Sequence, residues 1–335
     1  MTTRLAINGF GRIGRNILRA LYETGRSDLE IVAINDLAPT ANLAHLLKYD
    51  SVHGRFPGTV NHTENSIDVG KGPIEVTAIR NLEDQNWADN DVDIVLECTG
   101  IFTVREKAAA HLDAGAKRVL ISAPGTASDK TVVYGVNQDV LTKDDLVVSN
   151  GSCTTNCLAP MAKVLHDAFG INNGFMTTIH AYTGDQPTLD GVHKKLNRGR
   201  AAALSMIPTS TGAARAIGLV MPELAGKLDG KAIRVPTPNV SAVDLVANLG
   251  KNVSVDEVNT VLREAAAGKM KGVLQVIDDP TVSIDFNHDP HSSSVMSGET
   301  VVLGDNLIRV LSWYDNEWGF SNRMLDTATE MAKFL

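Results

Sequence analysis

Three glycines near the start of the chain constrain its fold most strongly. Gly9, Gly11 and Gly14 follow directly on the apolar run at residues 5–7 and precede a helical pattern that extends to Tyr22. In this strand–turn–helix setting, the spacing G-x-G-x-x-G is typical of a loop that receives the pyrophosphate of a dinucleotide. Glycine permits the tight turn and the close approach of backbone to phosphate. The pattern therefore predicts an α/β fold around a parallel sheet.

An acidic residue after the next strand pattern supports a dinucleotide. Residues 30–34 form the next strand pattern, apolar from Ile31 onward, and Asp36 follows them, 22 positions after Gly14. An acid at this place accepts hydrogen bonds from the adenosine ribose and repels a 2′-phosphate, which favours NAD over NADP. The other interpretation is that Asp36 only caps the following helix.

The remaining periodicity divides the chain into two halves. In the first half strands alternate with helices, which predicts a Rossmann-type doubly wound parallel sheet. In the second half strands outnumber helices, which predicts an α+β catalytic domain with a mixed or antiparallel sheet. We expect strands at residues 93–97, 118–122, 174–180, 240–249, 282–286 and 307–313, and helices at 105–114, 254–267 and 321–334. The expected domains are residues 1–150, completed by a C-terminal helix at about 315–335, and residues 151–314.

The strongest candidate for chemistry is Cys153. It lies where the strand pattern at residues 146–148 gives way to a helical pattern that extends to Phe169. A thiol at a helix N-terminus feels the positive end of the helix dipole, which favours the nucleophilic thiolate. Spacing alone leaves other interpretations open: a buried core cysteine, or a metal or disulfide partner of Cys157 or Cys98.

The segment around Cys153 resembles the active-site signature of the phosphorylating glyceraldehyde-3-phosphate dehydrogenase family. The matching residues are Ser-Asn-Gly-Ser-Cys-Thr-Thr-Asn-Cys-Leu-Ala-Pro, at positions 149–160. The resemblance extends from Leu5 to the C-terminus, with long matches at residues 45–55, 207–214 and 313–319. It implies that Cys153 is the nucleophile and that His180 is the base. A lone histidine is more often structural, but an imidazolium beside the sulfur would stabilise thiolate.

The resemblance also assigns residues to the cofactor and to two phosphates. It implies NAD contacts from Gly9, Gly11, Arg12, Ile13, Gly14, Asp36, Arg80, Thr99, Ser122 and Asn316. Thr183 and Arg234 are expected to hold the substrate phosphate, and the expected partners of inorganic phosphate are Ser152, Thr154, Arg198, Thr211 and Gly212. Taken singly, Arg80 or any other of these arginines would be read as a surface charge, so the assignment depends on the set.

The basic loop at residues 182–203 is long enough to be functional, and in the family it packs across a subunit interface of a homotetramer. NAD-specific relatives usually carry Leu-Pro where this chain has Gly191-Val192, so the preference for NAD rests on Asp36 and Leu37. The implied reaction converts glyceraldehyde 3-phosphate, NAD and inorganic phosphate into 1,3-bisphosphoglycerate and NADH. Alternatives are erythrose-4-phosphate dehydrogenase, indicated by residues 287–292, an NADP-preferring form, and a non-catalytic NAD- or RNA-binding protein.

Composition limits the partners. The formal net charge is −8, which argues against nucleic acid as the main partner because a phosphate backbone attracts a basic surface. Three cysteines without a pairing pattern indicate a reducing compartment, and we expect a cytoplasmic protein. We expect no metal site and no membrane span, since no apolar stretch is long enough for one.

Overall fold

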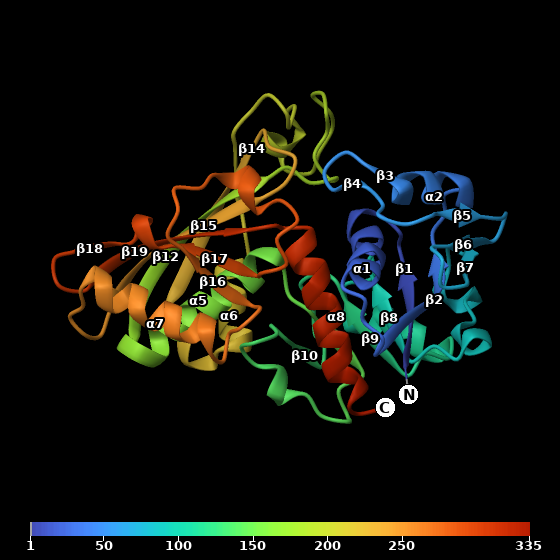
Figure 1. Cartoon of the computed structure of the whole chain (residues 1–335), viewed down its shortest axis with the longest axis horizontal. Helices are drawn as coiled ribbons and strands as arrows, with labels where there is room; N and C mark the ends of the chain where they lie inside the picture. The colour runs from blue at the N-terminus through green and yellow to red at the C-terminus, as the bar shows by residue number, and fades with distance from the viewer. Residues whose placement is uncertain (1) are drawn as a thin grey trace. The chain divides into compact units, whose positions relative to one another are not determined.

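A computed structural model describes residues 2–335, and these residues form two compact units. Among the described residues, the first unit contains 2–134, 138–152 and 321–335, and the second contains 135–137 and 153–320. Figure 1 shows the elements of each unit in chain order.

The first unit is built on a nine-stranded sheet in the order β10-β11-β9-β8-β1-β2-β7-β6-β5. All pairs from β10 to β7 are parallel, and only β6 and β5 are antiparallel to their neighbours. The chain runs from β1 to β2 on one side and later returns to β8 on the other. The carboxyl ends of β1 and β8 therefore form the switch point at which such sheets bind ligands.

The strands of this unit are β1 (Thr3–Asn8), β2 (Leu29–Asn35), β5 (Asn61–His62), β6 (Ser66–Asp68), β7 (Pro73–Thr77), β8 (Ile94–Glu97), β9 (Arg118–Ile121), β10 (Lys130–Thr131), β11 (Val147–Ser149) and the separate hairpin β3 (Tyr49–Asp50) and β4 (Gly54–Arg55). The helices are α1 (Arg12–Glu23), α2 (Thr40–Lys48), α3 (Arg105–Ala108), α4 (Ala110–Asp113) and, from Ser321 onward, α8 (Trp318–Ala332).

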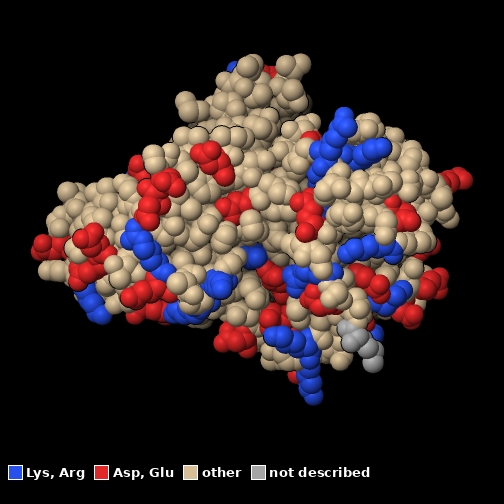
Figure 2. All heavy atoms as spheres, viewed as in Figure 1, with Lys and Arg blue, Asp and Glu red and all other residues tan. Residues whose placement is uncertain are grey.

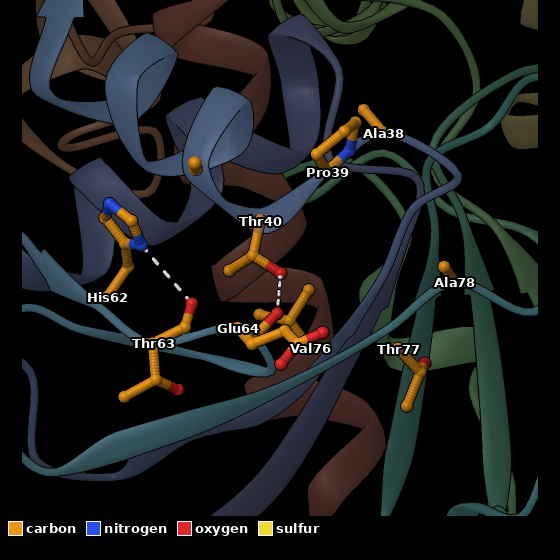
Figure 3. Close-up of a pocket in the computed structure, with 10 residues that line it drawn as sticks. Ala38, Pro39, Thr40, His62, Thr63, Glu64, Val76, Thr77 and Ala78 are labelled. Carbon is orange, nitrogen blue, oxygen red and sulfur yellow. Dashed lines mark hydrogen bonds between the residues drawn. The ribbon is translucent and has the colours of Figure 1, made fainter.

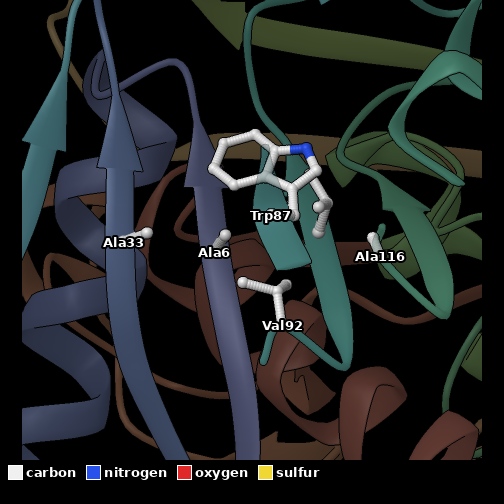
Figure 4. Packing of buried hydrophobic residues seen from close by; sticks show 6 residues of the cluster. Ala6, Ala33, Trp87, Val92 and Ala116 are labelled. Atoms are coloured by element: carbon white, nitrogen blue, oxygen red, sulfur yellow. The ribbon is translucent and has the colours of Figure 1, made fainter. Parts of the chain in front are cut away.

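Small residues of the central strands allow a tryptophan to lie flat on the sheet. Trp87 is 2% exposed and packs on Ala6 of β1 and Ala33 of β2, as Figure 4 shows. Val92, Val95 and Ala116 complete this cluster. Larger side chains on β1 and β2 would push the indole off the sheet, because protein cores are close-packed.

The second unit is built on an eight-stranded mixed sheet in the order β13-β14-β12-β15-β19-β17-β16, with β18 paired to β19. Only β12–β14 and β16–β17 are parallel. The strands are β12 (Ile171–Ala181), β13 (Ile207–Ser210), β14 (Leu228–Val235), β15 (Ser241–Leu249), β16 (Leu274–Ile277), β17 (Ser293–Met296), β18 (Val301–Leu303) and β19 (Leu307–Tyr314). The helices α5 (Cys153–Phe169), α6 (Ala213–Val220) and α7 (Val255–Ala267) pack on this sheet (Figure 1).

The two predicted sheet types are confirmed, and one predicted strand is wrong. Residues Ser283–Phe286 form a short 3₁₀ helix and not a strand. The carboxylate of Asp285 accepts a hydrogen bond from the Val282 N–H (2.8 Å), and the Asp285 N–H donates to the Val282 carbonyl (3.0 Å), which closes a turn. Val282 and Ile284 are 60% and 71% exposed, so their alternation does not mark a buried sheet face.

Candidate functional site

The glycine loop of the first unit has the three spatial properties that its spacing predicts. Gly9 has a φ of +94°, and a Cβ there would come within 2.7 Å of the Thr99 backbone nitrogen. A Cβ on Gly14 would come within 2.3 Å of the Gly9 carbonyl oxygen, so helix α1 packs directly on the loop. A Cβ on Gly11 would meet nothing within 4 Å, so the loop is open on the side where a phosphate would approach.

Asp36 is attached to this loop and does not cap the following helix. Its carboxylate accepts hydrogen bonds from the backbone N–H groups of Phe10 (2.8 Å) and Ala38 (3.0 Å), whereas α2 begins at Thr40 with Pro39 in the capping position. A carboxylate has about four lone-pair sites. Asp36 therefore retains acceptor capacity for a pair of ribose hydroxyls.

The glycine loop and Asp36 border a cavity of 520 Å³. Thr99 and the exposed Arg80 both line it. The full lining is Asn8, Gly9, Gly11, Asn35, Asp36, Leu37, Ile79, Arg80, Asn81, Leu82, Cys98, Thr99, Ile101 and Phe102. The cavity lies at the carboxyl ends of β1, β2 and β8, the predicted position for a nucleotide.

A buried carboxylate that the sequence did not reveal holds the wall of this cavity. Glu97 is 1% exposed and accepts hydrogen bonds from the Thr99 N–H (2.8 Å) and hydroxyl, the Asn8 side-chain amide (2.6 Å) and His111 Nε2 (3.0 Å). The indole N–H of Trp87 donates to His111 Nδ1 (3.0 Å), so the ring proton lies on Nε2 and is directed at Glu97. Glu97 is separated by 89 positions from Asn8, a distance that no local pattern reveals.

Arg12, Ile13 and Ser122 lie beside the same switch point. Helix α1 begins at Arg12, so the backbone of Arg12 and Ile13 forms its first turn. The Arg12 guanidinium makes a bidentate ion pair with Asp50 (2.6 and 3.1 Å) and holds the pKa of that carboxyl below its usual range. Ser122 follows β9, and its N–H donates to the Glu97 carbonyl (3.0 Å).

A second cavity, of 480 Å³, is bordered by residues 38–41, where the β2–α2 connection leads into α2 (Figure 3). His62, Thr63 and Glu64 face Pro39 and Thr40 across it, and the Thr40 hydroxyl donates to the Glu64 carbonyl (2.6 Å). Its lining contains no cysteine, arginine or lysine, and no sequence-predicted site residue belongs to it.

In the second unit, the structure brings together the two predicted catalytic residues. Helix α5 begins at Cys153, and β12 carries His180 one position before its end. The Cys153 Sγ lies 3.5 Å from His180 Nε2. His180 Nδ1 lies 2.7 Å from the Ala181 carbonyl oxygen, which can only accept a hydrogen bond. The Nδ1 proton is thereby fixed, and the Nε2 lone pair is directed at the thiol.

Burial acts against a standing thiolate and imidazolium at this pair. Burial raises the pKa of the Cys153 thiol, although Arg234, Thr154 and the N–H groups at the helix start act in the opposite direction. Burial, reinforced by the nearby Arg234 charge, lowers the pKa of His180 to about 3. Burial therefore favours a thiol beside a neutral imidazole, whose Nε2 lone pair is placed to accept the thiol proton.

Cationic and hydroxyl groups gather beside the cysteine and histidine. The Arg234 guanidinium donates to the Ala181 carbonyl (2.8 Å) and to the Thr183 hydroxyl (3.0 Å). The Thr183 hydroxyl donates to one oxygen of Asp185 (2.6 Å), and Arg198 pairs with the other oxygen. Burial and the Arg198 charge lower the pKa of Arg234. Two guanidinium charges thus lie near one carboxylate, which of the two arginines only Arg198 contacts directly, and this excess of positive charge suits an oxyanion.

The other predicted phosphate residues are distributed differently. Thr211 and Gly212 lie at the start of α6, where the Thr211 hydroxyl accepts the Ala213 N–H (3.1 Å). Within residues 2–335, neither of them is hydrogen-bonded to Thr183, Asp185, Arg198 or Arg234. The Thr154 hydroxyl is engaged by the Tyr314 hydroxyl (2.9 Å), which Thr178 also contacts (3.0 Å). Ser152 directly precedes α5 and is half-buried.

The remaining cysteines differ from Cys153. Cys157 is fully buried beside Ser293, and burial raises its pKa to about 12. Cys98 is half-buried, and its pKa is also raised by burial.

No group of three or more histidine, cysteine, aspartate or glutamate side chains within the described chain is arranged to hold a metal ion. None of the helices in residues 2–335 has both the length and the apolarity to cross a membrane.

These features define a two-unit α/β protein with a dinucleotide-type loop in one unit and a cysteine–histidine pair in the other. Residues 3–105 match the family model described as glyceraldehyde 3-phosphate dehydrogenase, NAD binding domain, and residues 152–316 match that described as its C-terminal domain. The chain is 65% identical to the glyceraldehyde-3-phosphate dehydrogenase of Cereibacter sphaeroides, and the match covers 100% of both chains. It is 65% identical to the Xanthobacter flavus enzyme of that name, over 99% of each chain, and 55% identical to that of Mycobacterium tuberculosis, over 100% of each. The chain belongs to the glyceraldehyde-3-phosphate dehydrogenase family.

Proposed function

We propose that this protein oxidises glyceraldehyde 3-phosphate to 1,3-bisphosphoglycerate with NAD and inorganic phosphate, the activity of glycolysis and gluconeogenesis. The observation that carries the proposal is the 3.5 Å approach of the Cys153 Sγ to an imidazole nitrogen whose tautomer is fixed by Ala181. The names of the relatives support the same activity, and they do not favour erythrose-4-phosphate dehydrogenase, an NADP-preferring form or a non-catalytic binding protein.

The first unit fits NAD. The open face of Gly11 and the first turn of α1 suit a pyrophosphate, and Asp36 has acceptor capacity for the ribose hydroxyls and repels a 2′-phosphate. We assign the remaining contacts to Gly9, Ile13, Gly14, Arg80, Thr99, Ser122 and Asn316. When bound, NAD supplies a hydride acceptor, and all other chemistry belongs to side chains of this chain.

Cys153 begins the reaction. Its sulfur forms a bond to the aldehyde carbon, and the thiol proton moves to His180 Nε2. The N–H groups at the start of α5 are suited to stabilise the oxygen charge that develops on the thiohemiacetal. His180 then returns its proton to that oxygen and removes it again when the carbon loses hydride, which leaves a thioester on Cys153.

Phosphate completes the cycle. A phosphate oxygen attacks the thioester carbon, the carbon–sulfur bond breaks, and the leaving thiolate recovers the proton from His180. The proton that the attacking phosphate carried passes to solvent as the net proton of the reaction. We assign the substrate phosphate to Thr183 and Arg234, and inorganic phosphate to Ser152, Thr154, Arg198, Thr211 and Gly212. Because the Thr154 hydroxyl already contacts Tyr314, its contribution would come from its backbone N–H.

We also propose the organisation around this chemistry. Residues 1–150 with 315–335 would be the NAD-binding domain, and residues 151–314 the catalytic and oligomerisation domain.

Exposed apolar side chains support a homotetramer. On the second sheet, Phe175, Ile179 and Val246 are 47%, 37% and 39% exposed, and Val192 and Leu196 are exposed in the basic loop. Three free cysteines suit a cytoplasmic location. Acidic and basic side chains are interspersed on the face shown in Figure 2, which does not favour nucleic acid as the main partner.

The test compares rates of NADH formation with glyceraldehyde 3-phosphate and erythrose 4-phosphate, with and without phosphate, and with NADP in place of NAD. Rapid, phosphate-dependent turnover of the triose phosphate with NAD is the expected result. Preference for erythrose 4-phosphate without phosphate dependence would overturn the substrate and phosphate assignments.

A further inference from the structure

The peptide group of Ala181 connects several parts of the second unit. Its carbonyl accepts hydrogen bonds from His180 Nδ1 (2.7 Å) and from Arg234 (2.8 Å). Its N–H donates to the hydroxyl of Ser241 (3.0 Å). Ser241 is the first residue of β15 and has no exposed surface. One peptide group therefore links the catalytic histidine and the arginine to a buried serine that the mechanism does not use.

The hydroxyl of Ser241 determines which way an amide side chain faces. Because its oxygen accepts the Ala181 N–H, its single proton needs an acceptor, and the Asn316 Oδ1 lies 2.8 Å away. The Asn316 amide is thus fixed with its oxygen toward Ser241 and its NH₂ group on the opposite side. Asn316 is 4% exposed, yet this NH₂ group donates no hydrogen bond within residues 2–335 and is not sealed inside the unit.

We propose that Ser241 is a positioning residue that fixes Asn316 with its NH₂ group presented to the carboxamide oxygen of nicotinamide. The inference rests on the proposed function, in which Asn316 contacts that ring. In the opposite orientation, the Asn316 Oδ1 would face the carboxamide oxygen of nicotinamide, and neither oxygen can donate a hydrogen bond. Ser241 acts through Asn316 and does not touch the cofactor. Its effect is on the nicotinamide end of NAD and not on the adenosine end, which is assigned to Asp36.

The difference between the two ends of NAD supplies the test. We would measure by calorimetry the Kd of NAD and of ADP-ribose, which lacks nicotinamide, for the wild-type protein and for Ser241→Ala. The wild type is expected to bind NAD more tightly. Ser241→Ala should weaken NAD by about 10-fold, the value of one hydrogen bond, and leave ADP-ribose unchanged. Asn316→Ala should have the same effect, and adding Ser241→Ala to it should change nothing further.

A matched control removes an equally buried hydroxyl from the same sheet. Ser312 on β19 has no exposed surface, and its hydroxyl pairs with Ser293 (2.8 Å). Ser312→Ala should therefore leave the ratio of the Kd for ADP-ribose to the Kd for NAD unchanged. If Ser241→Ala fails to fold, Ser241→Cys is the second variant, because it keeps a side chain of similar shape and replaces the hydroxyl by a weak donor. Like Ser241→Ala, it should weaken NAD but not ADP-ribose and so lower this ratio.

An unchanged ratio in Ser241→Ala, or an equal loss for both ligands, would overturn the positioning role and leave the proposed function intact. Failure of the wild-type protein to bind NAD would overturn the proposed function and the inference together. A further loss on adding Ser241→Ala to Asn316→Ala would show that the serine acts elsewhere, and it would also overturn the inference.

Discussion

The buried imidazole of His180 predicts a specific loss of stability in acid. Burial lowers its pKa to about 3 in the folded protein, whereas an unfolded chain has a histidine pKa near 6.5. Between these values the unfolded state binds a proton that the folded state does not. The free energy of unfolding therefore rises with pH through this window, and the stability is lost as pH falls.

The magnitude follows from the two pKa values. From about pH 7.5 to about pH 4.5, the histidine of the unfolded state gains its proton. Each pH unit below about 6.5 lowers the free energy of unfolding by about 1.36 kcal/mol, so the loss over the roughly two units down to pH 4.5 is about 2.7 kcal/mol. His180→Asn keeps a neutral N–H donor within reach of the Ala181 carbonyl but has no group that titrates. All other groups titrate alike in both proteins and cancel from the difference.

The assay is urea unfolding of wild type and His180→Asn at both pH values and at one protein concentration. The wild type is expected to lose about 2.7 kcal/mol more than the variant between the two conditions. Equal losses would mean that the imidazole is already protonated in the folded state, and the assignment of a neutral base beside Cys153 would then be refuted.

Three further substitutions test the two ligand sites. Gly9→Ala places a Cβ within 2.7 Å of the Thr99 nitrogen at a φ of +94°, so NAD affinity and thermal stability should both fall; an unchanged Tm would contradict the close approach. Asp36→Ala should improve the ratio of kcat/KM for NADP to that for NAD by about 10-fold or more, since the repelling carboxylate is gone, and steady-state kinetics that show no change would remove Asp36 from the ribose site. Arg234→Lys keeps the charge but loses the planar guanidinium, whose one Nη1 group donates to both Ala181 and Thr183 and whose other N–H groups suit a phosphate. The KM for the triose phosphate should therefore rise by about 10-fold or more, and a KM within twofold of the wild-type value would exclude Arg234 from binding the substrate phosphate.

Features that depend on neighbours in sequence were predictable. The strand–turn–helix context of Gly9, Gly11 and Gly14 is contained in a short segment, and the structure has the expected turn and helix start. Cys153 was also placed correctly at a helix N-terminus, because the apolar strand and the helical pattern flank it directly. Alternation alone was misleading at residues 282–286, where a local side-chain bond closes a turn.

Features that depend on distant contacts were not predictable. The tautomer of His180 is set by a backbone carbonyl, and its protonation is set by burial and by Arg234, which is 54 positions away. The pairing of Arg198 with Asp185 and the bonds from Glu97 and Ser241 join segments that only the folded chain brings together. Residue type and spacing identify the candidates, but they do not give the direction of a proton or the state of a charge.

The central claim is that Cys153 carries a thioester that only phosphate releases. The most direct measurement mixes the protein with NAD and glyceraldehyde 3-phosphate in the absence of phosphate and records NADH formation rapidly. We predict a burst of about one NADH per chain, then arrest, and resumed turnover when phosphate is added, with no burst in Cys153→Ser. Continuous NADH formation without phosphate, or a full burst in Cys153→Ser, would contradict the account.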